Sequence, residues 1–210
     1  MCPHVSGDML RPVCVPWDFV IYSQWVKFMN AWDHFKTITT HKAIVGELCF
    51  RLHLYRQGLL HDMSKYSPTE FMTGVKYYRG TYSPNTAERN ERGYSLAWLH
   101  HKGRNKHHWE FWVDFMKQGL VPAKMPYRYV LEMFCDRVAA SKVYRGKDYD
   151  DTYPLTYYNN SKDHYYMHDE TKALIEYLLT YLAQHGLGET IGMINEKHGY
   201  DDYPLHKEED

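Results

Sequence analysis

Apolar residues recur along this chain at the spacing of an α-helix, and that periodicity limits its possible folds more than any other feature. From His41 to Tyr55, the members of one stripe lie four, three, four and three positions apart, through Val45, Leu48 and Leu52. Strict alternation of apolar and polar residues never persists, and no Asn-Gly or Asp-Gly pair provides a tight hairpin turn. The sequence therefore predicts an all-α fold with no sheet larger than a hairpin.

Residues that begin and end helices divide the chain into predicted segments. The clearest start lies at Ser67, the predicted N-cap, with Pro68 as the first helical residue and Glu70 as the returning partner of a capping box. Gly80 ends that helix. The other predicted segments are helices over residues 17–32, 39–58, 94–103, 105–119, 125–146 and from 169 onward, with a loop over 81–93.

The length and charge of the chain limit its organisation and its partners. A chain of 210 residues is long enough for one domain with a core and short for two. We expect the core over about residues 17–185, a Tyr-, Asp- and Asn-rich excursion over 147–168, and a tail over 187–210 with a solvated acidic end. The formal charge of -1 argues against binding of long nucleic acid. Without a long apolar run or a signal-peptide pattern, no membrane association and a cytoplasmic location are predicted.

The histidine content points to metal binding. The chain has 14 histidines but only 4 cysteines, none in a CxxC pair, which favours sites built from imidazole and carboxylate. The adjacent pair His61 and Asp62 follows Gly58 and two leucines, and so begins a new turn. Taken alone, this pair is more typical of a capped turn with a hydrogen-bonded histidine. His41, however, lies on the apolar stripe and needs a partner for its ring, and a fold-back after Gly58 brings the pair beside it.

A second histidine cluster surrounds a glycine-containing turn, at positions 100, 101, 107 and 108. In the helix predicted after this turn, His108 shares a face with aromatic residues and is expected to point inward. His107 shares a face with acidic residues, which predicts a solvated side chain. The same reasoning does not separate His100 from His101. The alternative for the whole cluster is a basic surface turn.

Asp136 is a further ligand candidate on a late helix. It points away from the main apolar stripe, which includes Phe134 and Val138. The opposite face also carries apolar residues, as is typical of an interior helix, and a buried carboxylate must be paired or bind a metal. The alternatives are a surface carboxylate or an ion pair with Arg137 or a nearby lysine. If Asp136 lies on the surface, Asp114 becomes the next candidate.

Together, His41, the His61-Asp62 pair and Asp136 resemble the HD superfamily of metal-dependent phosphohydrolases. Residues 59–65, LLHDMSK, are similar to the LLHDIGK signature of that superfamily, with Met-Ser in place of Ile-Gly. The stretch from about residue 20 to about residue 140 looks closer still to an uncharacterised family of small HD-like proteins from bacteria and their phages. The resemblance implies one helical domain of the HD type over residues 1–210.

The resemblance also implies a set of ligands for one or two divalent ions. Its members are His41, His61, Asp62, His101, His108 and Asp136. Of these, His101 and His108 would hold the second ion, with Asp62 as the bridge. Manganese, iron, cobalt, nickel or zinc suits such imidazole and carboxylate ligands.

The activity implied by the resemblance is hydrolysis of a nucleotide or another small phosphate ester. Asp62 and Lys65 are the expected catalytic residues. Lys65, Arg104 and His107 are expected to bind the phosphate of this small-molecule substrate, since a compact ammonium suits a phosphate oxygen. A non-haem di-iron oxygenase of the HD type and a metal-binding module without catalysis are the alternatives. The sequence leaves a homo-oligomer open.

Overall fold

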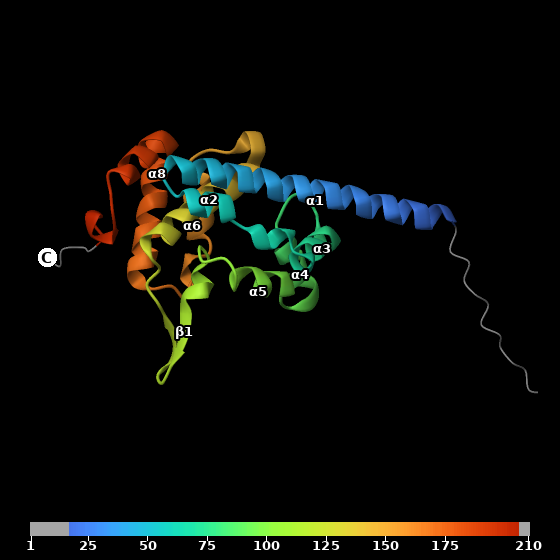
Figure 1. Ribbon diagram of the computed structural model, residues 1–210, viewed down its shortest axis with the longest axis horizontal. Coiled ribbons are helices and arrows are strands. Elements are labelled where there is room, and N and C mark those ends of the chain that lie inside the picture. The colour runs from blue at the N-terminus through green and yellow to red at the C-terminus, as the bar shows by residue number, and fades with distance from the viewer. Residues whose placement is uncertain (1–16, 206–210) are drawn as a thin grey trace, which may run out of the picture.

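The longest helix, α1 (Trp17–Arg51), runs along the length of the protein, and its N-terminal part projects beyond the other helices (Figure 1). The computed structural model describes residues 17–205, with side chains from residue 28 onward. The predicted division of this segment into helices over 17–32 and 39–58 is wrong. No glycine or proline interrupts residues 33–40, and the hydroxyl group of Thr37 donates to the carbonyl oxygen of Asp33 within the helix.

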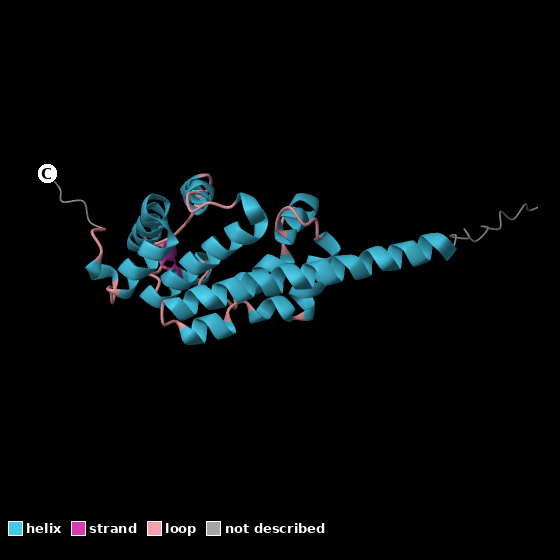
Figure 2. Cartoon of the chain, turned by 90° about the horizontal axis from the view of Figure 1, so that it is seen from above, coloured by secondary structure: helices cyan, strands magenta, loops and turns pink. Residues whose placement is uncertain are grey.

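After α1, the described chain forms further helices and one hairpin. These elements are α2 (Tyr55–Leu60), α3 (Pro68–Tyr77), α4 (Pro84–Arg92), α5 (Leu96–Lys102), β1 (Val113–Met116), β2 (Gly119–Pro122), α6 (Tyr127–Arg145), α7 (Tyr153–Asn159) and α8 (Asp169–Asn195). Helices make up 71% and strands 4% of the structure, which confirms the predicted all-α fold. The view in Figure 2 shows how little of the chain is strand.

Gly58 does not end a helix, contrary to the prediction. It lies inside α2, which begins after a turn at His53, where φ is 59°. A Cβ atom on Gly58 would lie 3.0 Å from side-chain atoms of Cys49 and Phe50 on α1. The glycine therefore permits α2 to pack closely against α1, which brings the turn after α2 beside the middle of α1.

The predicted start of α3 is correct, whereas the loop predicted after it is not. Ser67 accepts a hydrogen bond from the backbone N–H of Glu70 at 3.5 Å, with Pro68 as the first helical residue. The predicted loop over 81–93 is wrong, because Ser83 caps α4 and Gly93 ends it in the left-handed conformation.

The helix predicted over 105–119 is also wrong. The segment forms a single 3₁₀ turn at Trp109–Trp112 and then the antiparallel hairpin β1–β2, in which Met116 pairs with Gly119. Aromatic and β-branched residues at 109–115 favour extended backbone over helix. Gly119, with φ of 110°, accommodates the turn. Within residues 17–205 no sheet is larger than this hairpin, as predicted, although the hairpin itself was not predicted.

The hydrophobic core joins α1, α6 and α8. Its best buried side chains are at most 2% exposed and include Val45 and Leu48 of α1, Phe134 and Val138 of α6, and Leu178 of α8. The helix predicted from 169 onward is α8, which is capped by His168 and bends at a left-handed glycine before ending at Asn195. The tail predicted from residue 187 is therefore partly helical, and the acidic end at 208–210 lies outside the described residues.

Two further features of the described chain are the length of its apolar helices and the position of the excursion at 147–168. No helix in the described part of the chain is both long and apolar enough to cross a membrane. The excursion at 147–168 contains α7 and packs near α6 and α8. Residues of this excursion line the same cavity as Asp136, which lies in the middle of α6.

Candidate metal centre

The His61-Asp62 turn places both side chains in the interior. His61 is 2% exposed and has extended backbone, and Asp62 is 1% exposed with φ of 54° in the left-handed region. Aspartate tolerates this conformation better than most residues. The ammonium group of Lys42 on α1 donates to the carbonyl oxygens of Leu59 and His61, at 2.8 and 2.7 Å. These contacts anchor the turn to α1 and allow two adjacent residues to reach one point.

The first ligand group consists of residues from three distant segments. Its members are His41 on α1, His61 and Asp62 in the turn, and Asp136 on α6, whose ligand atoms lie within 4.8 Å of one another. Nε2 of His41 lies 2.9 Å from Oδ1 of Asp136, and Nε2 of His61 lies 3.4 Å from the same oxygen. The alternative, an ion pair between Asp136 and Arg137, is not formed among the described residues. Asp114 is an exposed residue of β1 and is not a member of this group.

The second ligand group shares Asp62 with the first. Its other members are His101, His107 and His108, again with ligand atoms within 4.8 Å of one another. Oδ1 of Asp62 lies 3.2 Å from Nε2 of His101 and 3.5 Å from Nε2 of His107. Oδ2 of Asp62 faces the first group, 3.3 Å from Nε2 of His61. The two carboxylate oxygens thus point into different groups, which is the geometry of a bridging ligand.

The interpretation of His107 as a solvated, substrate-binding residue does not agree with its position. His107 is 1% exposed and its ring lies 4.2 Å from that of His108, centroid to centroid. The assignment by helical phase failed because residues 105–108 form a turn rather than a helix. Asn105 holds that turn, donating from Nδ2 to the carbonyl oxygen of His101 at 2.8 Å and to the hydroxyl of Ser64 at 2.8 Å.

Two buried glutamates, absent from the sequence-based ligand set, orient the histidines from behind. A single oxygen of Glu132, Oε1, lies 2.9 Å from Nδ1 of His61 and 3.1 Å from Nδ1 of His107. Glu70 contacts Nδ1 of His101 at 2.8 Å with one oxygen and Nδ1 of His100 at 2.6 Å with the other. A carboxylate that accepts a hydrogen bond from Nδ1–H holds the proton on that nitrogen and leaves Nε2 free to bind a metal.

These contacts distinguish His100 from His101 and explain the missing capping box. Nε2 of His101 faces Asp62, whereas His100 does not belong to either ligand group. The carboxylate of Glu70 turns toward the histidines and not back to Ser67. Glu132 was findable from the sequence, because it precedes Asp136 by four residues and therefore shares its helix face.

Several polar atoms at the centre lack a close hydrogen-bond partner. Nε2 of His107 and His108 and Oδ1 of Asp62 are buried and make no hydrogen bond to any described residue. Nε2 of His61 has only long contacts, at 3.3 Å to Asp62 and 3.4 Å to Asp136, while Oδ2 of Asp62 is ion-paired with Lys65. Buried polar groups without partners are rare and costly in folded proteins. Imidazole nitrogens and carboxylate oxygens within this spacing suit a divalent transition metal. The residues therefore fit one or two such ions.

The electrostatics favour ionised carboxylates and a neutral His108 at the centre. Burial opposes protonation of His61 and His101, but the Asp62 carboxylate outweighs it and raises the pKa of each above that of a free imidazole, so an ion would displace a proton from each. Burial favours the neutral acid of Asp62, but His61 and Lys65 outweigh it and hold the pKa of Asp62 well below its usual value. Hydrogen bonds from His41 and His61 likewise lower the pKa of Asp136 against the effect of burial. Burial, reinforced by His107, lowers the pKa of His108 well below that of a free imidazole. Ionised carboxylates and a neutral imidazole are the forms that bind metals.

A cavity of about 610 Å³ opens beside the centre. Its lining includes ligand candidates from both groups, namely His41, His101, His108 and Asp136. Lys65 also lines it, with Nζ 2.6 Å from Oδ2 of Asp62. Burial opposes the charged form of Lys65, but Asp62 and Asp136 raise its pKa, so the ammonium is retained. Arg104 is exposed, donates to the carbonyl oxygen of His100 and does not line the cavity.

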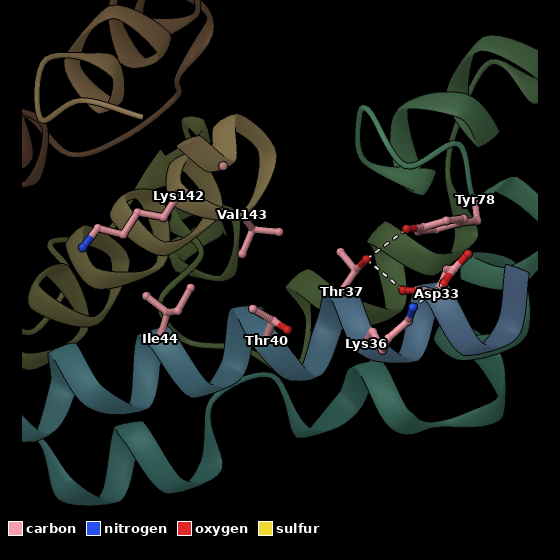
Figure 3. Close-up of a pocket in the computed structure, with 9 residues that line it drawn as sticks. Asp33, Lys36, Thr37, Thr40, Ile44, Tyr78, Lys142 and Val143 are labelled. Atoms are coloured by element: carbon pink, nitrogen blue, oxygen red, sulfur yellow. Dashed lines mark hydrogen bonds and ion pairs between the residues drawn. The ribbon is translucent and has the colours of Figure 1, made fainter. Parts of the chain in front are cut away.

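A shallower groove between α1 and α6 adjoins the cavity (Figure 3). It measures about 410 Å³, and Thr37, Tyr78 and Val143 line both spaces. The hydroxyl groups of Thr37 and Tyr78 lie 3.1 Å apart and are hydrogen bonded, as Figure 3 shows. Lys36 and Lys142 line the groove from α1 and α6. Lys36 is paired with Asp33, which also lines the groove, at 2.7 Å, so Lys142 provides the excess positive charge of the groove that borders the cavity.

Comparison with known proteins identifies the family of the chain. Residues 30–181 match DUF5662, a family of unknown function, and the chain belongs to that family. The matched range contains every ligand candidate in both groups, together with Glu70 and Glu132. No curated protein and no solved structure matches the chain.

Proposed function

We propose that this member of the DUF5662 family is a metal-dependent phosphohydrolase that acts on a nucleotide or another small phosphate ester. The observation that carries the proposal is the shared Asp62, whose two oxygens face two imidazole-rich groups next to an open cavity. The proposal is also supported by the order of these residues along the chain, which resembles that of HD phosphohydrolases. One or two transition metal ions are part of the proposal.

The protein residues divide the work between binding the ions and binding the phosphate. Ions held here would supply Lewis acidity and lower the pKa of a bound water. Glu132 and Glu70 fix the orientation of the imidazoles, so that the ligand atoms are in place before an ion binds. Lys65 directs its ammonium to the edge of the centre, where it would neutralise charge on a phosphate oxygen.

A screen of purified protein tests this proposal. The protein is stripped of metal, loaded separately with manganese, iron, cobalt, nickel or zinc, and assayed with phosphomonoesters, phosphodiesters and nucleotides. We expect release of phosphate or of a nucleoside product with at least one ion, and loss of that activity in Asp62→Ala. Asp114→Ala is the matched control, because Asp114 is an exposed carboxylate outside both groups. Turnover that is equal in Asp62→Ala and wild type contradicts the proposal.

The principal alternative is a non-haem iron oxygenase, since a histidine-rich pair of sites with a bridging carboxylate also suits iron. Lys65 favours phosphate, because an ammonium beside the centre has a clear role toward a phosphate oxygen. Anaerobic iron loading followed by electron paramagnetic resonance and oxygen-uptake measurements separates the two. A metal-binding module without catalysis would bind ions and show neither activity.

A further inference from the structure

Arg137 carries a guanidinium group that lines the cavity without an acidic partner. It follows Asp136 on α6, and among the residues with described side chains it forms no ion pair. Its hydrogen bond, from Nη1 to the hydroxyl of Tyr165, is long at 3.5 Å. Its Nε atom is buried and has no acceptor. A guanidinium offers five N–H donors, so most of the bonding capacity of Arg137 is unused.

Two tyrosines of the excursion at 147–168 fix the position of this group. The Cζ atom of Arg137 lies 5.5 Å from the ring centroid of Tyr158 and 5.3 Å from that of Tyr165. Tyr158 is fully buried, and the hydroxyl of Tyr165 is hydrogen bonded to that of Ser161 at 2.5 Å. Stacking on aromatic rings orients a guanidinium without neutralising its charge. The tyrosine-rich segment therefore presents Arg137 as a preorganised cation.

The other charged groups on this side of the cavity do not satisfy Arg137. Glu110 lines the same cavity, but it makes no ion pair with Arg137. Arg89 adds a second guanidinium, which lies over the ring of Trp98 at 5.2 Å. Glu70 faces the histidines, as described above. The cavity is thus lined by the candidate metal ligands and Lys65, and also by a guanidinium that interacts with Glu110 only at long range and makes no direct ion pair.

We propose that Arg137 binds a second anionic group of the substrate. The inference rests on the proposed phosphohydrolase function and narrows the substrate class to small phosphate esters that carry a further phosphate or carboxylate. One oxyanion would bind at the metal centre and Lys65, and the other would accept paired hydrogen bonds from the planar guanidinium. An ester of a neutral alcohol would leave Arg137 buried without an acceptor, and a site built this way discriminates against such a ligand.

The experiment compares two ligands of nearly equal size, 2-phosphoglycolate and 2-hydroxyethyl phosphate, which differ in a carboxylate. Binding to metal-loaded protein is measured by calorimetry at constant free metal, so no turnover is required. Wild type should bind phosphoglycolate at least about tenfold more tightly, the range of one charged hydrogen-bonding partner. The second pair is inorganic pyrophosphate and inorganic phosphate. Comparing their binding shows whether the second group that the protein prefers is a phosphate or a carboxylate.

Arg137→Gln should reduce this preference to near unity while binding of hydroxyethyl phosphate stays within about twofold. The matched control is Arg128→Gln, which removes another arginine of α6 that stacks on a tyrosine, at 5.1 Å, outside the cavity. If Arg137→Gln does not fold, Arg137→Lys keeps the charge, loses the planar fork and should still lower the preference several-fold.

The inference is overturned if wild type binds the two members of each pair equally, or if its preference persists in Arg137→Gln or is unchanged in Arg137→Lys. If the preference depends on Arg137 but no ion supports hydrolysis, the anion site stands and the phosphohydrolase proposal fails. If neither phosphate compound nor pyrophosphate binds, both are wrong.

Discussion

Replacement of Glu132 tests the metal centre without changing a member of either ligand group that contains Asp62. Glu132 also lies close enough to His61 and His107 to form a third possible group with them. Its Oε1 atom accepts from Nδ1 of His61 and of His107, so one oxygen orients an imidazole in each ligand group. Glu132→Gln keeps an acceptor of the same shape but removes the charge. Hydrogen bonds to a charged group are stronger than neutral ones by about 1 kcal/mol each, so two of them amount to about 2 kcal/mol. That corresponds to an affinity for metal about thirtyfold weaker.

Glu132→Ala should have a larger effect, because it leaves both Nδ1 protons without an acceptor. We expect a loss of at least about a hundredfold, at the upper end of what outer carboxylates contribute to metal affinity. The assay is competition against a chromophoric chelator, together with elemental analysis of protein purified without chelator. Glu88→Gln is the control, since Glu88 is also buried, at 1% exposure against 5% for Glu132, but accepts from the hydroxyl of Ser95 and pairs with Arg92 rather than with a histidine.

The result that would refute this reasoning is specific. If Glu132→Gln and Glu132→Ala bind metal as tightly as wild type while remaining folded, Nε2 of His61 and His107 does not bind an ion. Melting temperatures of the metal-free proteins separate this outcome from unfolding. Weak metal binding by Glu88→Gln would show that any buried carboxylate has the same effect, and would remove the argument for Glu132.

Three other measurements address the cation, the disputed histidines and a buried imidazole. Lys65→Ala should lower turnover by about 10²–10³ with metal content unchanged, and full activity would exclude a contact between Lys65 and the substrate. His107→Ala and His108→Ala should both lower metal content, by elemental analysis, and a wild-type content in either removes that residue from the ligand set. Burial and Lys65 lower the pKa of His34 to about 4. Because the pKa is lower in the folded protein, His34 contributes stability that is complete above about pH 6.5 and is lost as the pH falls toward 4. At about pH 5, the free energy of unfolding measured in urea should therefore fall by about 1–2 kcal/mol more in the wild type than in His34→Gln.

The parts of the fold that sequence reasoning predicted are those determined by local chemistry. The start of α3 at Ser67 and Pro68 depends on a cap and a fixed φ, both of which act within one turn. The hairpin was missed because helical phase was extended past Asn105, although the following residues are aromatic and β-branched. The same error reversed the orientation assigned to His107. Phase arguments fail wherever the assumed element is not formed.

The candidate site also divides into residues that a local motif identifies and residues that only the folded structure identifies. His61 and Asp62 were recognised from a short motif, and the structure brings them to His41 and Asp136 across long sequence separations. Glu132 was missed although its position one turn before Asp136 places it on the same helix face, whereas the role of Glu70 depends on which ring nitrogens it faces and follows only from tertiary packing. The cavity itself had no sequence signal, since residues from several helices and the tyrosine-rich excursion line it.

The two ligand groups are not chemically independent. Asp62 supplies one oxygen to each group, and Oε1 of Glu132 contacts an imidazole of each. An ion in one group withdraws electron density from both shared residues, and so changes the affinity of the other group. Linkage requires the same factor in both directions, whichever ion binds first. Since two cations that share carboxylates weaken each other's binding, metal titrations of this protein should show negative cooperativity, with the second ion bound more weakly than the first.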